Sequence, residues 1–177
     1  EQALNLAQVG DALGGVDLIK QAGDVDKPGA LEPLRRIAPL HAVRGNFHVL
    51  DLSSGGVSLP RAIDLRLAGR RIVVTHGYLP GPISLWFKVR DVVLRALDGD
   101  EKARFNGRLA RRLSALYPRA DVIVFGHTHH AYVEWLGDTL MVNPGAVCPT
   151  LRERPSMARL TLDDGRPRAM IVPLDVR

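Results

Sequence analysis

The sequence predicts an α/β sandwich built on a mixed sheet. Segments with the apolar spacing of helices alternate with short apolar runs at first, and the last third of the chain is mostly short runs separated by Gly, Asp and Pro. The length of 177 residues suits a single domain with a buried core. Hydrophobic residues make up 46% and charged residues 24% of the chain, which is the balance of a globular protein. We therefore expect one domain over residues 1–177.

Turn and capping residues divide the first 75 positions into separate elements. Gly14-Gly15 ends a helix-like start, and Pro28 is well placed to begin a second, shorter helix. Gly69-Arg70 separates two β-like runs, which indicates a hairpin. The expected elements are a helix over 2–14, a strand from 16 that ends before Gly23-Asp24, a helix over 29–37, a strand over 40–43 and the hairpin strands 62–67 and 71–75.

The second half begins with helical spacing and continues with strands. Residues 84–97 carry apolar side chains on one face of a helix, and residues 101–116 form a second candidate helix after Asp98-Gly99-Asp100. The strands expected after them cover 122–125, 131–135, 140–142, 158–162 and 169–173.

Charge and cysteine content limit the classes of function. The single cysteine, Cys148, cannot form an internal disulfide and is typical of a reducing compartment, so we expect a cytoplasmic protein. No apolar run approaches the roughly 20 residues that span a bilayer, and no signal peptide is visible, so no membrane partner is expected. The formal charge is +5, and arginines are dense between Arg104 and Arg119. These arginines form either a solvated helix face or a binding surface for an anionic partner.

Polar residues of one chemical kind follow four of the expected strands. They are Gly23-Asp24, Gly45-Asn46, His76-Gly77 and Gly126-His127-Thr128-His129. In open α/β sheets, ligand sites collect at the carboxyl ends of the strands. Carboxylate, amide and imidazole groups are the donors that Mn²⁺, Fe²⁺, Ni²⁺ or Zn²⁺ accept, and the absence of thiolates argues against a structural zinc site. Alone, Gly-Asp and Gly-Asn are more often turns, a lone His-Gly is more often structural, and His127-Thr128-His129 binds metal about as often as not, so the prediction rests on the ordered set.

These four motifs, in this order, resemble those of the calcineurin-like metallophosphoesterases. Asn143-Pro144-Gly145 resembles the turn that follows in the small, single-domain phosphodiesterase branch, and the similarity runs from about Asp17 to Pro173. The resemblance implies a four-layer αββα sandwich of mixed sheets with two divalent metal ions at one end. We expect Mn first, with Fe, Ni or Zn as alternatives.

The resemblance also implies roles for single residues. Asp24 would bridge both metals, Asn46, His76 and His127 would bind the second metal, and His129 would bind the first. Two such ions clamp a phosphoryl group and lower the pKa of a shared water, and the resulting hydroxide attacks phosphorus in line with the leaving oxygen. Asp24, Asn46 and His48 are the expected catalytic residues, with His48 as a candidate general acid.

Three departures from the family pattern matter. The Asp-any-His motif that opens the family's metal site does not precede Asp24, so the family's first strand is missing from this chain and the first metal would keep only Asp24 and His129. Either the natural protein has residues upstream or it has lost this half-site. Phe47 follows Asn46 where the family often has His or Cys. Residues 80–119 form a helical insertion that would cap the site, hold an anionic substrate or join two copies of the chain.

We therefore expect a divalent-metal-dependent phosphoesterase, more specifically a phosphodiesterase. Its substrate would be a phosphorylated small molecule or a nucleotide. The alternative is a scaffold of the same fold that binds proteins with weak or no catalysis, as a retromer sorting subunit does. A nuclease-like protein that holds nucleic acid on its arginines is a third reading, which we favour less.

Overall fold

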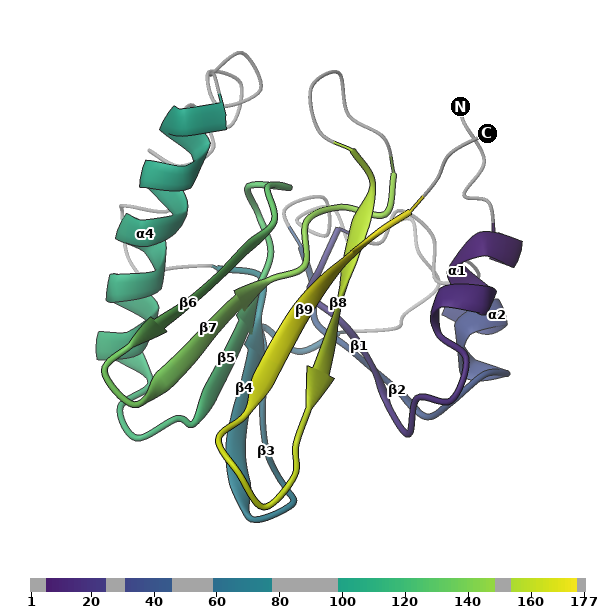
Figure 1. Ribbon diagram of the computed structural model, residues 1–177, viewed down its shortest axis with the longest axis horizontal. Helices are drawn as coiled ribbons and strands as arrows, with labels where there is room; N and C mark the ends of the chain where they lie inside the picture. The colour runs from purple at the N-terminus through teal and green to yellow at the C-terminus, as the bar shows by residue number, and fades with distance from the viewer. Residues whose placement is uncertain (1–5, 25–30, 46–58, 78–98, 149–153, 175–177) are drawn as a thin grey trace.

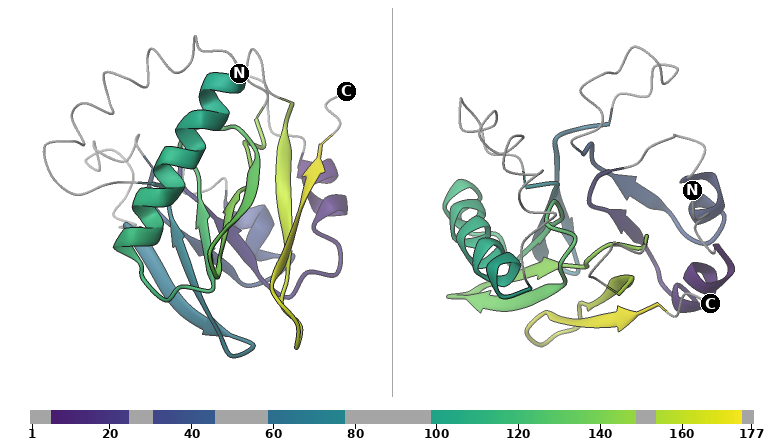
Figure 2. Two further views of the ribbon diagram at one scale, coloured as in Figure 1. Left: turned by 60° about the vertical axis from the view of Figure 1, so that its left-hand side comes forward. Right: turned by 90° about the horizontal axis from the view of Figure 1, so that it is seen from above.

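The described elements stack in four layers. A computed structural model describes residues 6–24, 31–45, 59–77, 99–148 and 154–174. Figures 1 and 2 show helix α4 (Gly99–Leu116) on one side, then a five-stranded sheet, then two small sheets, and finally helices α1 (Leu6–Ala12) and α2 (Glu32–Arg35) on the far side. The predicted αββα sandwich of mixed sheets is confirmed.

The larger sheet has parallel strands at its centre and antiparallel strands at its edges. Its strands are, in spatial order, β3 (Ala62–Leu67), β4 (Arg70–Thr75), β5 (Val122–Phe125), β7 (Thr139–Asn143) and β6 (Tyr132–Leu136). The pairs β4–β5 and β5–β7 are parallel, whereas β3 and β6 pair antiparallel. Every residue of β5 and β7 is buried, as expected for strands covered on both faces. This order brings the carboxyl ends of β4 and β5 side by side.

Helix α4 covers one face of this sheet. Its buried residues Phe105, Leu109 and Leu113 recur at intervals of four, so they form one apolar stripe. The stripe packs against side chains that alternate along the central strands, namely Val73, Ile123, Phe125 and Met141. Residues 99–116 of the segment 80–119 therefore form a structural layer of the sandwich.

The two small sheets cover the opposite face. In the first, β1 (Ile19–Gln21) and β2 (Leu40–Ala42) are parallel, and in the second, β8 (Ser156–Thr161) and β9 (Arg168–Pro173) are antiparallel. Side chains of both small sheets, or of the residues that follow their strands, pack on the large sheet, among them Ala22, Val43 and Leu160. On the outer side, Ile19 contacts the cluster that contains Val9 and Leu13.

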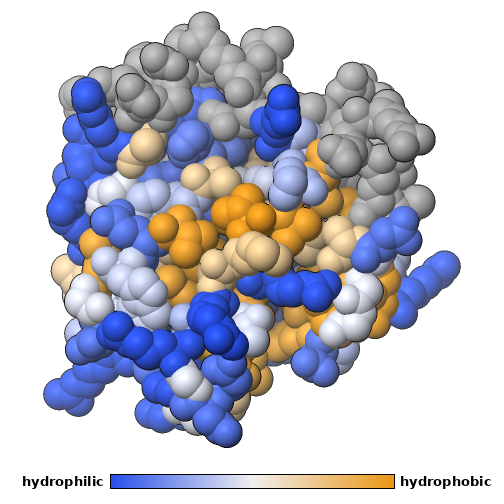
Figure 3. All heavy atoms as spheres, viewed as in Figure 1, coloured by the Kyte–Doolittle hydropathy of each residue, from blue (hydrophilic) through white to orange (hydrophobic). Residues whose placement is uncertain are grey.

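Apolar residues gather on one face of the described part of the chain. Figure 3 shows them in the middle of the face that is seen in Figure 1, with charged residues around them. Among the described residues, the exposed large apolar side chains are Ile37, Leu116, Val133 and Met170. None of the helices described in the structure is long and apolar enough to cross a bilayer.

Several expected elements differ in their bounds. The first strand begins at Ile19 rather than at residue 16. Among the described strands it pairs only with β2, and β2 begins after Pro39, which has no N–H to donate. The hairpin is confirmed, with its turn at Ala68-Gly69, where both residues have positive φ (46° and 71°). Helix α4 begins at Gly99, and the expected helix over 84–97 lies outside the described residues.

Candidate metal centre

Strand ends from two sheets bring four of the predicted ligands to one region. His76 directly follows β4, and His127 follows β5 after Gly126. The register pairs Thr75 with Phe125, so these two histidines leave the large sheet at the same edge. Asp24 follows β1 of the small sheet, after Gly23. Asn46 and His48 lie outside the described residues, so their predicted roles stay predictions.

A single carboxylate oxygen of Asp24 faces two imidazole nitrogens. Asp24 Oδ2 lies 3.1 Å from His129 Nε2 and 3.5 Å from His76 Nε2. The side chain of His76 is 2% exposed and that of Asp24 is 15% exposed. These groups are oxygen and nitrogen donors of the kind that divalent transition metals bind. The donor atoms of Asp24, His76 and His129 are therefore of the right kind to share a cation.

The ring of His76 is fixed by the strand that precedes Asp24. His76 Nδ1 lies 2.8 Å from the carbonyl oxygen of Ala22, and since a carbonyl only accepts, Nδ1 must donate the proton. A neutral His76 then carries its lone pair on Nε2, the nitrogen that faces Asp24. A histidine held in this way by a backbone carbonyl is oriented for metal binding.

The third histidine is kept neutral by its surroundings. The His127 ring lies edge-on to His76, with the ring centroids 5.4 Å apart, and the ring of Phe105 lies 6.1 Å from it, centroid to centroid. Burial is the main cause that lowers the pKa of His127 to about 4, and the charges of His76 and His129 act in the same direction while Asp24 opposes them. At neutral pH the imidazole is therefore uncharged, which is the form that binds metals.

The backbone of the site adopts conformations that L-residues seldom take. Asp24, His127 and His129 have φ of 56°, 77° and 58°. Such residues cluster at functional sites, where the surrounding structure holds them. Two glycines allow the close approach of the strands: a Cβ on Gly23 would lie 2.3 Å from His76 Nδ1, and one on Gly45 would lie 2.0 Å from the backbone nitrogen of Asp24.

A buried polar group beside the histidines was not found from the sequence. Asn106 of α4 and Asn143 of β7 are both 0% exposed, and with Thr128 they form a hydrogen-bonded cluster beneath residues 126–130. The sequence indicated Asn143 only as the first residue of the Asn-Pro-Gly turn, not as part of a buried cluster. The available signal for Asn106 was a polar residue directly after Phe105, inside the stretch of α4 that faces the sheet.

The donor atoms are present without a finished coordination shell. Across residues 6–24, 31–45, 59–77, 99–148 and 154–174, no three His, Cys, Asp or Glu side chains are arranged to hold one ion. The assignments of Asp24, His76, His127 and His129 as ligands therefore stay predictions, supported in part by the distances given above.

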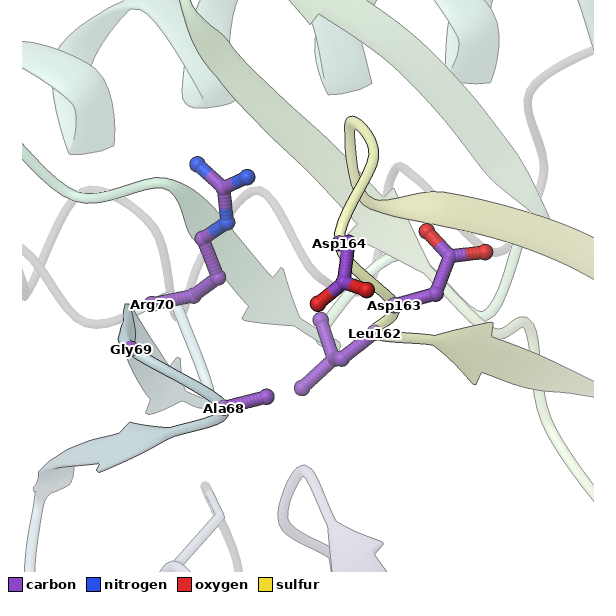
Figure 4. Close-up of a pocket in the computed structure, with 6 residues that line it drawn as sticks. All are labelled: Ala68, Gly69, Arg70, Leu162, Asp163 and Asp164. Carbon is purple, nitrogen blue, oxygen red and sulfur yellow. The ribbon is translucent and has the colours of Figure 1, made fainter.

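A separate hollow lies far from these residues. It has a volume of about 370 Å³ and is lined by two turns, Ala68–Arg70 and Leu162–Asp164 (Figure 4). The first turn precedes β4, whereas His76 follows that strand, so the hollow is at the opposite end of the sheet. Arg70 donates a hydrogen bond to the Gly165 carbonyl (3.0 Å), which links the two turns. Of the predicted ligands that the structure describes, none lines this hollow.

The chain is similar to several known proteins over most of its length. A probable metallophosphoesterase of Methanocaldococcus jannaschii is 31% identical over 167 residues, which are 93% of this chain and 70% of that protein. The probable metallophosphoesterase YsnB of Bacillus subtilis is 34% identical over 153 residues, 84% of this chain and 70% of that protein. Among solved structures, Vps29 of Chaetomium thermophilum has a TM-score of 0.60 at 18% identity and covers 98% of this chain, with 90% of its own chain matched. At that identity the likeness shows the fold alone.

Carboxylate and imidazole groups at the strand ends of a layered sandwich are donors of the kind that metal-dependent hydrolases use. The profile of the calcineurin-like phosphoesterase superfamily domain matches residues 2–165. The chain belongs to this superfamily. The family is one of phosphoric ester hydrolases and implies divalent metal ions, so the resemblance drawn from the four motifs is confirmed.

Proposed function

We propose that the protein is a divalent-metal-dependent phosphodiesterase whose site is built on Asp24. The observation that carries this proposal is the single carboxylate oxygen, Asp24 Oδ2, shared between His129 Nε2 at 3.1 Å and His76 Nε2 at 3.5 Å. Asp24 would bridge two ions, with Asn46, His76 and His127 holding one and His129 the other. When bound, such ions supply positive charge to a phosphoryl group and lower the pKa of water.

The chain's own residues would preserve that charge for the reaction. His76 donates the Nδ1–H to the Ala22 carbonyl, so a neutral His76 would present the lone pair of Nε2, and His127 is neutral because burial lowers its pKa to about 4. A site of neutral imidazoles with one bridging carboxylate cancels only part of the charge of two divalent ions. The remaining positive charge would stabilise the phosphoryl transition state. His48 is the proposed donor of a proton to the leaving oxygen.

A phosphorylated small molecule or a nucleotide is the proposed substrate. Arg108, Arg111 and Arg112 are exposed on α4, outside the apolar stripe that faces the sheet. They would raise the local concentration of an anion near the molecule. A role of residues 80–119 in joining two copies of the chain is also proposed, and a nucleic-acid substrate is less favoured.

The sequence relatives favour this enzyme over a protein-binding scaffold. Relatives at 31% and 34% identity are both described as probable metallophosphoesterases. The likeness to Vps29 is at 18% identity and concerns the fold alone. A preference for diesters over monoesters is our proposal. An archaeal phosphodiesterase has a similar fold, with a TM-score of 0.59 at 17% identity, and it covers 95% of this chain.

Hydrolysis of two aryl phosphates tests the proposal. The metal-stripped protein should be inactive, and added Mn²⁺ should restore hydrolysis of bis(p-nitrophenyl) phosphate more than that of p-nitrophenyl phosphate. Asp24→Asn should remove the activity. Asp138→Asn is the matched control, because Asp138 is fully exposed in the turn between β6 and β7. Equal activity with and without a chelator would refute metal dependence, and a faster monoester reaction would refute the diester preference.

A further inference from the structure

We propose that Asn106 of helix α4 is a positioning residue that holds the metal-binding histidines in place. We call residues 126–130 the ligand loop, since they include His127 and His129. The inference rests on the proposed function, because it assumes that these histidines bind an ion. It goes beyond the proposed function by assigning to Asn106 the role of holding the ligand loop in position.

Asn106 reaches the ligand loop from a different layer of the sandwich. Its side chain is fully buried, at 0% exposure, beside the sheet. Its Nδ2 donates to the carbonyl oxygen of His130 at 2.9 Å, and its Oδ1 accepts from the Thr128 hydroxyl at 2.7 Å. One amide therefore contacts the loop on both sides of His129.

The cluster around Asn106 leaves little freedom to its members. The Thr128 hydroxyl has one proton, which it gives to Asn106, so it accepts from Asn143 Nδ2 at 3.0 Å and from the His130 N–H at 3.3 Å. Asn143 Nδ2 also lies 3.0 Å from the Gly126 carbonyl, and Asn143 Oδ1 accepts from the Gly145 N–H at 3.0 Å. Because the His130 carbonyl requires a donor, the Asn106 amide has only one orientation that satisfies the cluster.

The loop needs such support because its two histidines are in unfavourable conformations. His127 has φ of 77° and His129 has φ of 58°, in the region that favours glycine. Without contacts that oppose it, the backbone would relax toward negative φ and turn both imidazoles. Thr128 lies between the two histidines, so holding its hydroxyl and the His130 carbonyl restrains the segment that carries both rings.

A purely structural role in docking α4 must be distinguished from positioning. Leu113 lies on the same helix, is 0% exposed and packs in the cluster that joins α4 to the sheet. Its side chain is apolar and cannot hydrogen-bond to the ligand loop. Leu113→Ala therefore weakens helix packing and serves as a matched control for loss of stability.

The test compares metal affinity with thermal stability in the full-length protein. Asn106→Leu keeps the side-chain size and removes both hydrogen-bonding groups, Thr128→Val removes the hydroxyl, and Thr128→Ser restores it. Affinity for Mn²⁺ is measured by calorimetry, and the visible absorption of bound Co²⁺ reports the ligand geometry. Loss of a group that orients a metal ligand typically weakens binding about 10–100-fold.

We expect that weakening, with an altered Co²⁺ spectrum, for Asn106→Leu and Thr128→Val. Thr128→Ser should bind like wild type, and Leu113→Ala should lower the melting temperature with its affinity unchanged. Wild-type affinity and spectrum in both Asn106→Leu and Thr128→Val would overturn the inference, as would an equal loss of affinity in Leu113→Ala. If Asn106→Leu does not fold, the contrast between Thr128→Val and Thr128→Ser decides. Failure of the wild-type protein to bind either ion would refute the proposed function itself.

Discussion

Replacing Gly45 by alanine should disable the site by displacing Asp24. A Cβ at position 45 would lie 2.0 Å from the Asp24 nitrogen, 2.2 Å from its Oδ1 and 2.7 Å from its Cα. Oδ1 is the end of a side chain and can turn aside, but the nitrogen and Cα belong to the backbone and cannot. Gly45 and Asp24 each lie three residues beyond the last paired residues of β2 and β1, so the pairing of these strands limits how far the two can separate.

The size of the effect follows from these distances. Increasing 2.0 Å to an ordinary contact of about 3.4 Å requires a displacement of about 1.4 Å. Overpacking of this kind costs about 1–3 kcal/mol of unfolding free energy. A misplacement of about 1 Å near the reacting atoms can reduce turnover about 100-fold. We therefore expect a loss of that order in kcat/KM, together with weaker metal binding.

Gly69→Ala is the matched control. Gly69 has φ of 71°, in the left-handed region, yet a Cβ there would meet nothing within 4 Å. It lies in the β3–β4 turn, at the opposite end of β4 from His76. This variant should lose about 1–2 kcal/mol because alanine disfavours left-handed φ, with activity unchanged. The assay is hydrolysis of bis(p-nitrophenyl) phosphate with Mn²⁺ beside thermal unfolding. Gly45→Ala with activity and affinity within threefold of wild type would refute the reasoning.

Four further outcomes are expected. Asp24→Ala and His127→Ala should each abolish metal-dependent hydrolysis of an activated aryl phosphodiester, and wild-type turnover in either variant with metal retained would contradict the site. The free energy of unfolding of the metal-free protein should fall as pH drops from about 6.5 to about 4, because His127 then binds a proton in the unfolded chain but not in the folded protein. The difference between the two pKa values corresponds to at most about 3 kcal/mol. Urea titrations across this pH range should show a shallower fall for His127→Gln than for the wild type. Titration of this chain with Mn²⁺ should give about one tight site, because Asp24 and His129 are the only predicted ligands of the first metal. Two equally tight sites would reveal a further ligand. The role of the segment 80–119 is tested by deleting residues 84–97 alone, because α4 covers the large sheet and must be kept. The deletion should change the oligomeric state, the substrate range or KM. If all three are unchanged, residues 84–97 neither cap the site nor join two copies of the chain.

The fold could be predicted where the local pattern and the tertiary structure agree. Strand β5 was expected over 122–125 and has these bounds, because a wholly apolar run between Asp121 and Gly126 has no alternative to burial. The first strand was expected three residues too early, since its start is determined by Pro39 on its partner strand rather than by its own residues. The spatial order β5–β7–β6 was not predicted, because pairing between strands leaves no periodicity in either one.

The candidate site was predicted in its donor residues but not in its supports. Glycine beside Asp, Asn or His after an apolar run is a local pattern, so Asp24, His76 and His127 could be selected from the sequence. Asn106 lies 20 positions before Gly126, in a helix, and nothing in its own neighbourhood reveals which backbone groups it meets. Hydrogen bonds between layers depend on how the layers are stacked, which a single sequence does not encode locally.

The contact between Asp24 and His129 spans 105 positions of the chain, and that between His76 and Ala22 spans 54. Contacts of such separation form late in folding, because closing a long loop costs chain entropy before any contact compensates for it. At about 5–20 residues per second, a ribosome needs about 5–20 s to proceed from the aspartate to the histidine. The two groups therefore cannot meet before His129 has been synthesised and has left the ribosome. An ion held between them would be acquired only after that point, so its uptake would report when the ligand loop has reached Asp24.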